Sequence, residues 1–206
     1  MAKVFQLRSS RPQKFGYKKA RRHSRSDGAD SQLNIFEQPE TAAARIVSLE
    51  TNLHPFERAL LYDERGNVIR ATEGYQESIS HGEYVADAYC NLGILESEQG
   101  CVDEAIECFK NSLKHDPALF ETHYNLANVY FDLGDYRPAQ VHYEIGASIE
   151  PGYANLYFNL ALTLAMQDDF ERAVEALESY QQLSSSPDED KTEKLLTTLR
   201  RSIGRS

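Results

Sequence analysis

The feature of this sequence that most limits its fold is a repeat of 34 residues. The triplets Asn91-Leu92-Gly93, Asn125-Leu126-Ala127 and Asn159-Leu160-Ala161 follow one another at this step. Other columns keep the same phase and hold Gly100, Gly134 and Asp168, then Ala105, Ala139 and Ala173, then Phe109, Tyr143 and Leu177, and finally Pro117 and Pro151. A period of this length is typical of units that bury their apolar faces against one another. We therefore expect a solenoid.

The 34-residue period, the Leu-Gly or Leu-Ala pair, the A-x-x-x-F spacing and the terminal Pro resemble the tetratricopeptide repeat (TPR). The resemblance implies an all-α fold, a right-handed superhelical solenoid of helix-turn-helix units. Full repeats are expected at residues 86–119, 120–153 and 154–187. Residues 52–85 keep Gly66, Ala71, Tyr75 and Ile79 in phase but lack the Leu-Gly pair, so they are expected to form a divergent N-terminal repeat.

Small residues in the repeat columns predict where helices pack closely. Gly93, Ala127 and Ala161 on first helices, and Ala105, Ala139 and Ala173 on second helices, would let neighbouring backbones approach. After the last repeat, residues 188–206 are expected to form a C-terminal capping helix. Its apolar side would hold Leu195, Leu196, Leu199 and Ile203.

The TPR resemblance implies that first helices line the concave side of the stack, where a partner would bind. Helical spacing then selects the side chains opposite the packing face. This expected groove consists of Asp87, Cys90, Asn91, Ile94 and Glu98, then Glu121, Tyr124, Asn125, Asn128, Phe131 and Asp132, and then Asn155, Phe158, Asn159 and Leu162.

The expected groove contains aromatic, amide and acidic side chains and no Lys or Arg, which favours a peptide or helix with basic or neutral side chains. Tyr124 and Asn125 are expected to face solvent. Asn91, Asn125 and Asn159 are similar in arrangement to the asparagine ladder of the O-linked N-acetylglucosamine transferase repeats, although Asn beside the Leu-Gly pair is also common for packing. A carboxylate clamp for acidic chaperone tails would need cations, whereas the matching columns hold Cys90, Ile94, Asn125, Asn155 and Asn159.

The N-terminal segment differs sharply in charge from the rest of the chain. Residues 1–25 carry nine Lys or Arg and no acid, while the remaining residues carry thirteen bases against 32 acids, giving net charges of about +9 and −19. We expect residues 1–38 to form a disordered basic arm and residues 39–51 to form a linker helix. The basic side chains singled out in the arm are Lys14, Lys18, Lys19, Arg21, Arg22 and Arg25.

Four roles remain open for this basic arm. It could be a solvated tail, or it could bind nucleic acid or a ribosomal surface, because cations interleaved with Phe15 and Tyr17 can meet phosphates and stack on bases. A targeting sequence is the third role, although the segment is poor in Leu and Ala. The fourth is docking onto the acidic solenoid of the same molecule or of a second copy.

Motifs for chemistry are missing from the sequence, which has no phosphate-binding Gly loop, no H-E-x-x-H and no nucleophile elbow. Cys90, Cys101 and Cys108 match no zinc spacing and are expected to be small buried residues in a reducing, cytoplasmic protein. We expect no catalytic residue, cofactor, metal or membrane span. The expected function is a protein-binding adaptor. The alternatives are an adaptor tethered to nucleic acid or ribosomes and a sensor module of a transcription-related complex, and homo-oligomerisation stays open.

Overall fold

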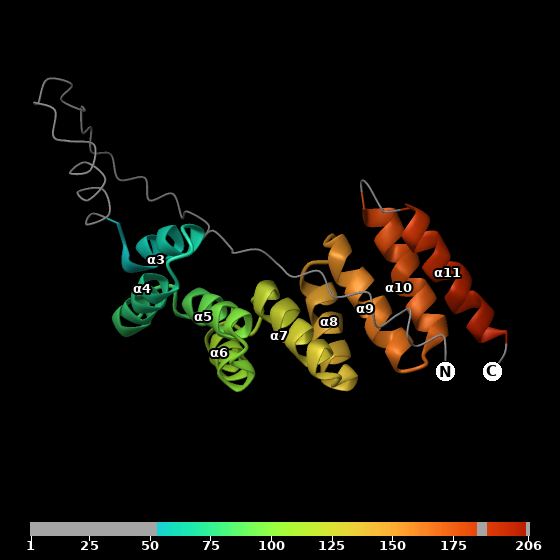
Figure 1. The fold of residues 1–206 in the computed structure, drawn as a ribbon, viewed down its shortest axis with the longest axis horizontal. Helices are drawn as coiled ribbons and strands as arrows, with labels where there is room; N and C mark the ends of the chain where they lie inside the picture. Colours follow the sequence, from blue (N-terminus) through green and yellow to red (C-terminus); the bar gives the residue numbers. More distant parts are fainter. Residues whose placement is uncertain (1–52, 185–188, 205–206) are drawn as a thin grey trace, which may run out of the picture.

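The computed structural model describes residues 53–184 and 189–204, without the side chains of residues 189–191. These residues form nine helices and no strand, and Figure 1 shows the helices following one another in chain order along the longest axis. The helices are α3 (Pro55–Glu64), α4 (Val68–His81), α5 (Val85–Gln99), α6 (Val102–His115), α7 (Phe120–Leu133), α8 (Tyr136–Ile149), α9 (Ala154–Met166), α10 (Phe170–Leu183) and α11 (Glu189–Ile203).

The expected all-α solenoid is confirmed by this arrangement. Each first helix (α3, α5, α7 or α9) packs against the second helix that follows it, and each pair then packs against the next pair. The predicted basic arm, its six singled-out cations and the predicted linker helix lie outside the described residues.

Close packing within each pair depends on the small residues of the repeat columns. Ala105, Ala139 and Ala173 are completely buried. At Gly93, an added Cβ atom would lie only 2.7 Å from the ring of Phe109 on the facing helix. The sequence prediction that these columns form the helix-packing core is therefore confirmed.

The turn between the helices of a full repeat uses a left-handed residue at the end of the first helix. Gly100 and Gly134 both have φ of 82°, a conformation that glycine adopts without strain. Asp168 occupies the same column with φ of 62°, and a short polar side chain is among the few that tolerate this conformation. The turn is thus conserved in geometry although its residue changes.

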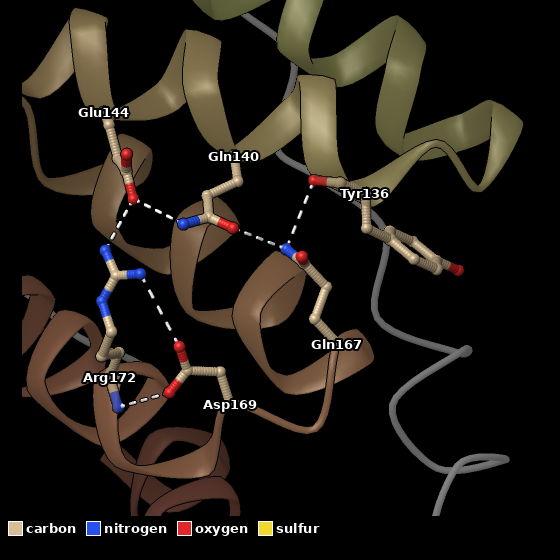
Figure 2. A network of polar contacts seen from close by, with 6 residues as sticks. All are labelled: Tyr136, Gln140, Glu144, Gln167, Asp169 and Arg172. Carbon is tan, nitrogen blue, oxygen red and sulfur yellow. Dashed lines mark hydrogen bonds and ion pairs between the residues drawn. The ribbon is translucent and has the colours of Figure 1, made fainter.

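Polar side chains tie the second-last repeat to the last one, as Figure 2 shows. Arg172 on α10 donates to Glu144 on α8 over 2.6 Å, and Gln140 donates to the same carboxylate over 2.7 Å. Gln167, just after α9, donates over 2.9 Å to the side-chain oxygen of Gln140. These contacts hold α8 against the α9–α10 pair and so help to set the spacing of the first helices.

A histidine pair lies between α7 and α8. The Nδ1 atoms of His123 and His142 are 3.0 Å apart, and Nε2 of His123 lies 3.0 Å from the carbonyl oxygen of Pro117. Because a carbonyl only accepts, His123 carries its proton on Nε2, and His142 then donates from Nδ1 to the bare Nδ1 of His123. Burial, and next the neighbouring His123, lower the pKa of His142 to about 4.

Both ends of the described solenoid are covered by helices. At the N-terminal end, Pro55 is the first residue of α3, and Phe56 and Tyr75 are buried between α3 and α4. At the other end, α11 packs on α10 and buries Leu196 and Leu199. This is the capping role expected for residues near the C-terminus.

The expectation that all three cysteines are buried is wrong for one of them. Cys90 is buried and Cys108 is partly buried, but Cys101 is exposed. The physical reason is position, because Cys101 is the N-cap of α6 and lies in the turn after α5.

Candidate partner-binding groove

The first helices gather on one side of the solenoid. Helix α5 contacts α7, and α7 contacts α9, although a second helix separates each of these pairs in the sequence. A pocket of about 30 Å³ opens between α5 and α7, enough for one or two water molecules or the tip of a side chain. This α5–α7 pocket is lined by Ile94, Ser97, Glu98, Phe109, Asn125, Asn128, Val129 and Asp132.

The α5–α7 pocket combines apolar walls with an acidic rim. Ile94 and Val129 are buried wall residues, one from each first helix, and the Phe109 ring closes the pocket from α6. Glu98 and Asp132 are exposed carboxylates near the C-terminal ends of α5 and α7. An apolar wall with a negative rim suits a side chain that has an aliphatic stem and a cationic head.

Asn128 is a buried polar residue behind the pocket. It is only 3% exposed, and its Nδ2 atom has almost no accessible surface. Its Oδ1 atom accepts from the Tyr143 hydroxyl and from Asn159 Nδ2. Its side chain also lies toward the Tyr124 hydroxyl, where a hydrogen bond opposes the larger rise that burial causes in the pKa of that tyrosine. The amide therefore belongs to the interior of the protein and is not open to a ligand.

The orientation of Asn128 is set by a buried cluster of two tyrosines and two asparagines, which we call the Tyr–Asn cluster (Tyr124, Asn128, Tyr143 and Asn159). Asn159 Nδ2 donates to the Tyr124 hydroxyl over 2.9 Å and to Asn128 Oδ1 over 3.1 Å. Burial raises the pKa of both tyrosine hydroxyls, so they stay protonated. The Tyr143 hydroxyl and Asn159 Nδ2 both donate to the Asn128 oxygen, so the orientation of this amide is fixed.

The structure corrects the expected exposure of the groove side chains. Tyr124 is completely buried and Asn125 is 6% exposed, so the prediction that both face solvent is wrong. The reason is that first helices of adjacent repeats touch each other, which helical spacing within one repeat does not reveal. The other groove residues that prove buried are Cys90, Asn91, Ile94, Asn128, Asn159 and Leu162.

The remaining groove residues predicted from the sequence keep some accessible surface. Glu98 and Asp132 are exposed, and the partly buried residues are Asp87, Glu121, Phe131, Asn155 and Phe158. Apart from Asn155, they are acidic or aromatic. The structure therefore brings the acidic side chains with Phe131 and Phe158 to the accessible surface and buries the other four amides and Tyr124.

The three amides of the predicted asparagine ladder differ in their hydrogen bonds. Asn125 Nδ2 donates to the backbone oxygen of Glu121 over 2.8 Å, and both protons of Asn159 Nδ2 go to the Tyr–Asn cluster. Asn91 Nδ2 is buried and has no partner among the residues described. The uniform ladder of available amides is thus wrong for Asn125 and Asn159. Asn125 donates within its own helix, and Asn159 donates to two side chains of the preceding repeat.

Three lining residues, Ser97, Phe109 and Val129, were not among the groove residues predicted from the sequence. Phe109 belongs to a repeat column that was expected to pack. Val129 lies four residues after Asn125 and three before Asp132, so the helical spacing could have selected it.

The described residues contain neither a cluster of metal-ligand side chains nor a helix suited to span a membrane. Within residues 53–184 and 189–204, no three His, Cys, Asp or Glu side chains come together as metal ligands. In the same ranges, no helix is both long and apolar enough to span a membrane.

Comparisons with known proteins give matches in two of three searches. A family model described as TPR repeat matches residues 95–134, and a model described as Tetratricopeptide repeat matches residues 124–188. A search of curated protein sequences gives no match. The two matched ranges together run from residue 95, near the end of α5, to residue 188, beyond the end of α10.

Solved structures of similar fold include MamA and a TPR of another protein. A MamA crystal structure is 18% identical over 73% of this chain and 81% of that chain, with a TM-score of 0.64. MamA AMB-1 is 19% identical over 77% of this chain and 85% of that chain, with a TM-score of 0.63. The first TPR of Spaghetti (RPAP3), bound to the HSP90 peptide SRMEEVD, is 21% identical over 58% of this chain and 93% of that chain, with a TM-score of 0.53. With its 34-residue period, paired helices and family matches, this chain is a tetratricopeptide-repeat protein.

Proposed function

We propose that this protein is a non-catalytic adaptor that holds a peptide or helix of a partner protein against α5, α7 and α9. The observation that carries the proposal is the pocket between α5 and α7. Its apolar walls and acidic rim suit a side chain of a bound polypeptide that has an aliphatic stem and a cationic head.

The charge of the groove defines the partner further. Glu98 and Asp132 flank the pocket, and Asp87 and Glu121 add negative charge on the same two helices. The RPAP3 TPR is bound to the acidic-tailed peptide SRMEEVD, whereas the acidic groups of the present groove would repel such a tail. We therefore propose a basic or neutral partner segment.

Peptide binding to the full chain tests this proposal. Three labelled peptides of equal length would carry Lys, Gln or Glu at the same alternate positions, and their affinities would be measured by fluorescence anisotropy. The Lys peptide should bind tightest, and its affinity should fall several-fold in Glu98→Gln and Asp132→Asn. Glu104→Gln, which removes an exposed carboxylate on α6 outside the pocket lining, is the matched control and should bind as the unchanged protein does.

Equal binding of all three peptides, or no binding of any, would contradict the proposed partner chemistry. Circular dichroism of each variant establishes that it is folded. Because Glu98 and Asp132 are exposed, their neutral replacements should leave stability within about 0.5 kcal/mol.

The charge of residues 1–25 favours a second function, tethering of the adaptor to nucleic acid or ribosomes. Nine cations with two aromatic side chains can neutralise phosphates and stack on bases. The test is binding of single-stranded RNA between 50 and about 200 mM salt, with the full chain and a variant whose arm cations are replaced by Gln. Affinity that is insensitive to salt or to these replacements would contradict it.

A further inference from the structure

We propose that the groove holds a partner segment at two places, a basic side chain at the α5–α7 pocket and an apolar or aromatic side chain between α7 and α9. The inference rests on the proposed function, because it defines a second contact of the same bound segment. The second contact, which we call the apolar site, consists of Phe131 on α7 and Phe158 and Met166 on α9.

Two residues of the apolar site take the place of polar residues of the α5–α7 pocket. One repeat of 34 residues earlier, Ser97 corresponds to Phe131 and Asp132 corresponds to Met166. Both Ser97 and Asp132 line the pocket. The junction between α7 and α9 therefore offers apolar side chains where the junction between α5 and α7 offers a hydroxyl and a carboxylate.

The side chains of the apolar site are held in place and keep some accessible surface. Phe131, Phe158 and Met166 are partly buried and pack on the hydrophobic core that α7 to α11 share. The Phe131 ring meets Tyr136 at the start of α8, with ring centroids 5.5 Å apart, and the Phe158 ring meets Tyr180 on α10 at 5.2 Å. Rings that are already fixed lose little freedom when a ligand covers them, which favours binding.

Negative charge does not extend to this part of the groove. The groove carboxylates lie on α5 and α7 and are Asp87, Glu98, Glu121 and Asp132. Helix α9 contains no charged residue, and its corresponding positions hold Asn155 and Met166. A second cation of a bound segment would therefore lose water at α9 without gaining a counter-charge, whereas an apolar side chain would gain a surface to cover.

The spacing of the first helices sets the distance between the two contacts. Helix α7 contacts α5 on one side and α9 on the other, and Figure 1 shows the three helices following one another along the solenoid. Packed helices are about 8–10 Å apart, so the apolar site lies about one helix spacing from the pocket. An extended chain advances about 3.3 Å per residue, so about three residues cover this distance. Both chain directions satisfy this spacing, and the test includes both.

Peptide binding to the full chain tests the inference. The probes are fluorescein-labelled peptides of equal length with Lys at one position and Phe, Gln or Lys three residues away, each made in both orders. In its better order, the Phe peptide should bind roughly 3- to 10-fold tighter than the Gln peptide, because its ring leaves water against the apolar site. The peptide with a second Lys should gain much less.

Exchanging one residue between repeats should change this preference. Met166→Asp introduces the residue type that Asp132 provides one repeat earlier, and it should make the second Lys bind tighter than Phe. Met166→Gln should reduce the advantage of Phe without favouring Lys. Leu183→Asp makes the same change of charge at an exposed apolar position on α10, and it is the matched control that should leave the ranking unchanged. Circular dichroism establishes that each variant is folded.

The outcomes separate this inference from the proposed function. If the Phe and Gln peptides bind the unchanged chain equally in both orders, the inference is overturned, while a preference for Lys over Glu peptides still supports the adaptor. A Phe advantage that Met166→Asp and Leu183→Asp both leave unchanged overturns the assignment to the apolar site. If no peptide binds, the proposed function fails as well. A Phe advantage that Met166→Asp turns into a Lys advantage supports both.

Discussion

Replacing Gly93 by Ala should destabilise the protein, although alanine is the better helix former. Gly93 lies inside α5 and faces α6. The added Cβ would lie 2.7, 2.9 and 3.0 Å from three ring atoms of Phe109. Phe109 is completely buried, and the α5–α7 pocket that its ring borders, at about 30 Å³, is much smaller than a phenyl ring.

The expected change in free energy of unfolding combines two opposing terms. Alanine in place of glycine within a helix stabilises by about 0.5–1 kcal/mol. Overpacking of a closely packed core costs about 1–3 kcal/mol. Because the contact with Phe109 involves a rigid ring, the second term should win and leave a net loss of roughly 1–2 kcal/mol. For a chain of this size that loss lowers Tm by about 2–8 °C.

Gly146 on α8 provides a matched comparison for this prediction. A Cβ there would lie 2.8 Å from Cδ1 of Leu156, which is the end of a side chain that can rotate, and 3.5 Å from the nearest atom of Phe120. Gly146→Ala should therefore change stability much less than the replacement of Gly93.

Urea denaturation followed by circular dichroism measures both variants, with Phe109→Leu added to complete a double-mutant cycle. In the Phe109→Leu background, Gly93→Ala should become neutral or stabilising, because the rigid ring is gone. A Gly93→Ala protein that is as stable as the unchanged chain, or more so, would refute the assignment of a tight α5–α6 crossing at this point.

Three further predictions concern the core and the histidine pair. Ala139→Phe, at a completely buried position on α8, should cost roughly 1–3 kcal/mol or more in urea denaturation, and an unchanged midpoint would show that this column is not packed. Asn159→Leu should also cost about 1–3 kcal/mol, because it removes two donors from the Tyr–Asn cluster, and Tyr124→Phe should cost less, because it removes one acceptor. The pKa of His142 is lower in the folded protein, so the unfolded chain takes up a proton at this residue first as the pH falls. The contribution of neutral His142 to the free energy of unfolding is therefore fully present above pH 6.5 and is lost as the pH drops toward about 4. Because solvent screens the partly exposed ring, the loss in free energy of unfolding should be roughly 1–2 kcal/mol. His142→Gln should remove that part of the dependence of Tm on pH in thermal melts between about pH 7 and 4.5. An unchanged dependence on pH would contradict the link to this histidine.

The helical pairs and their packing columns could be predicted from the sequence because both follow from local rules. A repeat that recurs every 34 residues requires each unit to bury the same face, and small residues at fixed positions indicate where backbones meet. Gly93, Ala139 and Phe109 were assigned to the core on this basis, and all three prove buried. The sequence also indicated the acidic character of the groove, since Glu98 and Asp132 lie one turn beyond its other lining residues.

Exposure within the groove depended on the tertiary structure alone. Tyr124 and Asn125 are buried. Tyr124 packs on Tyr143 of its own repeat and accepts a hydrogen bond from Asn159 of the next first helix, and helical periodicity carries no information on contacts between repeats. The same applies to hydrogen bonding. Asn128 and Asn159 are the same residue type on equivalent helices, but Asn128 accepts two hydrogen bonds through Oδ1 whereas Asn159 donates two through Nδ2. Whether each amide donates or accepts is decided by the side chains that three-dimensional packing brings against it.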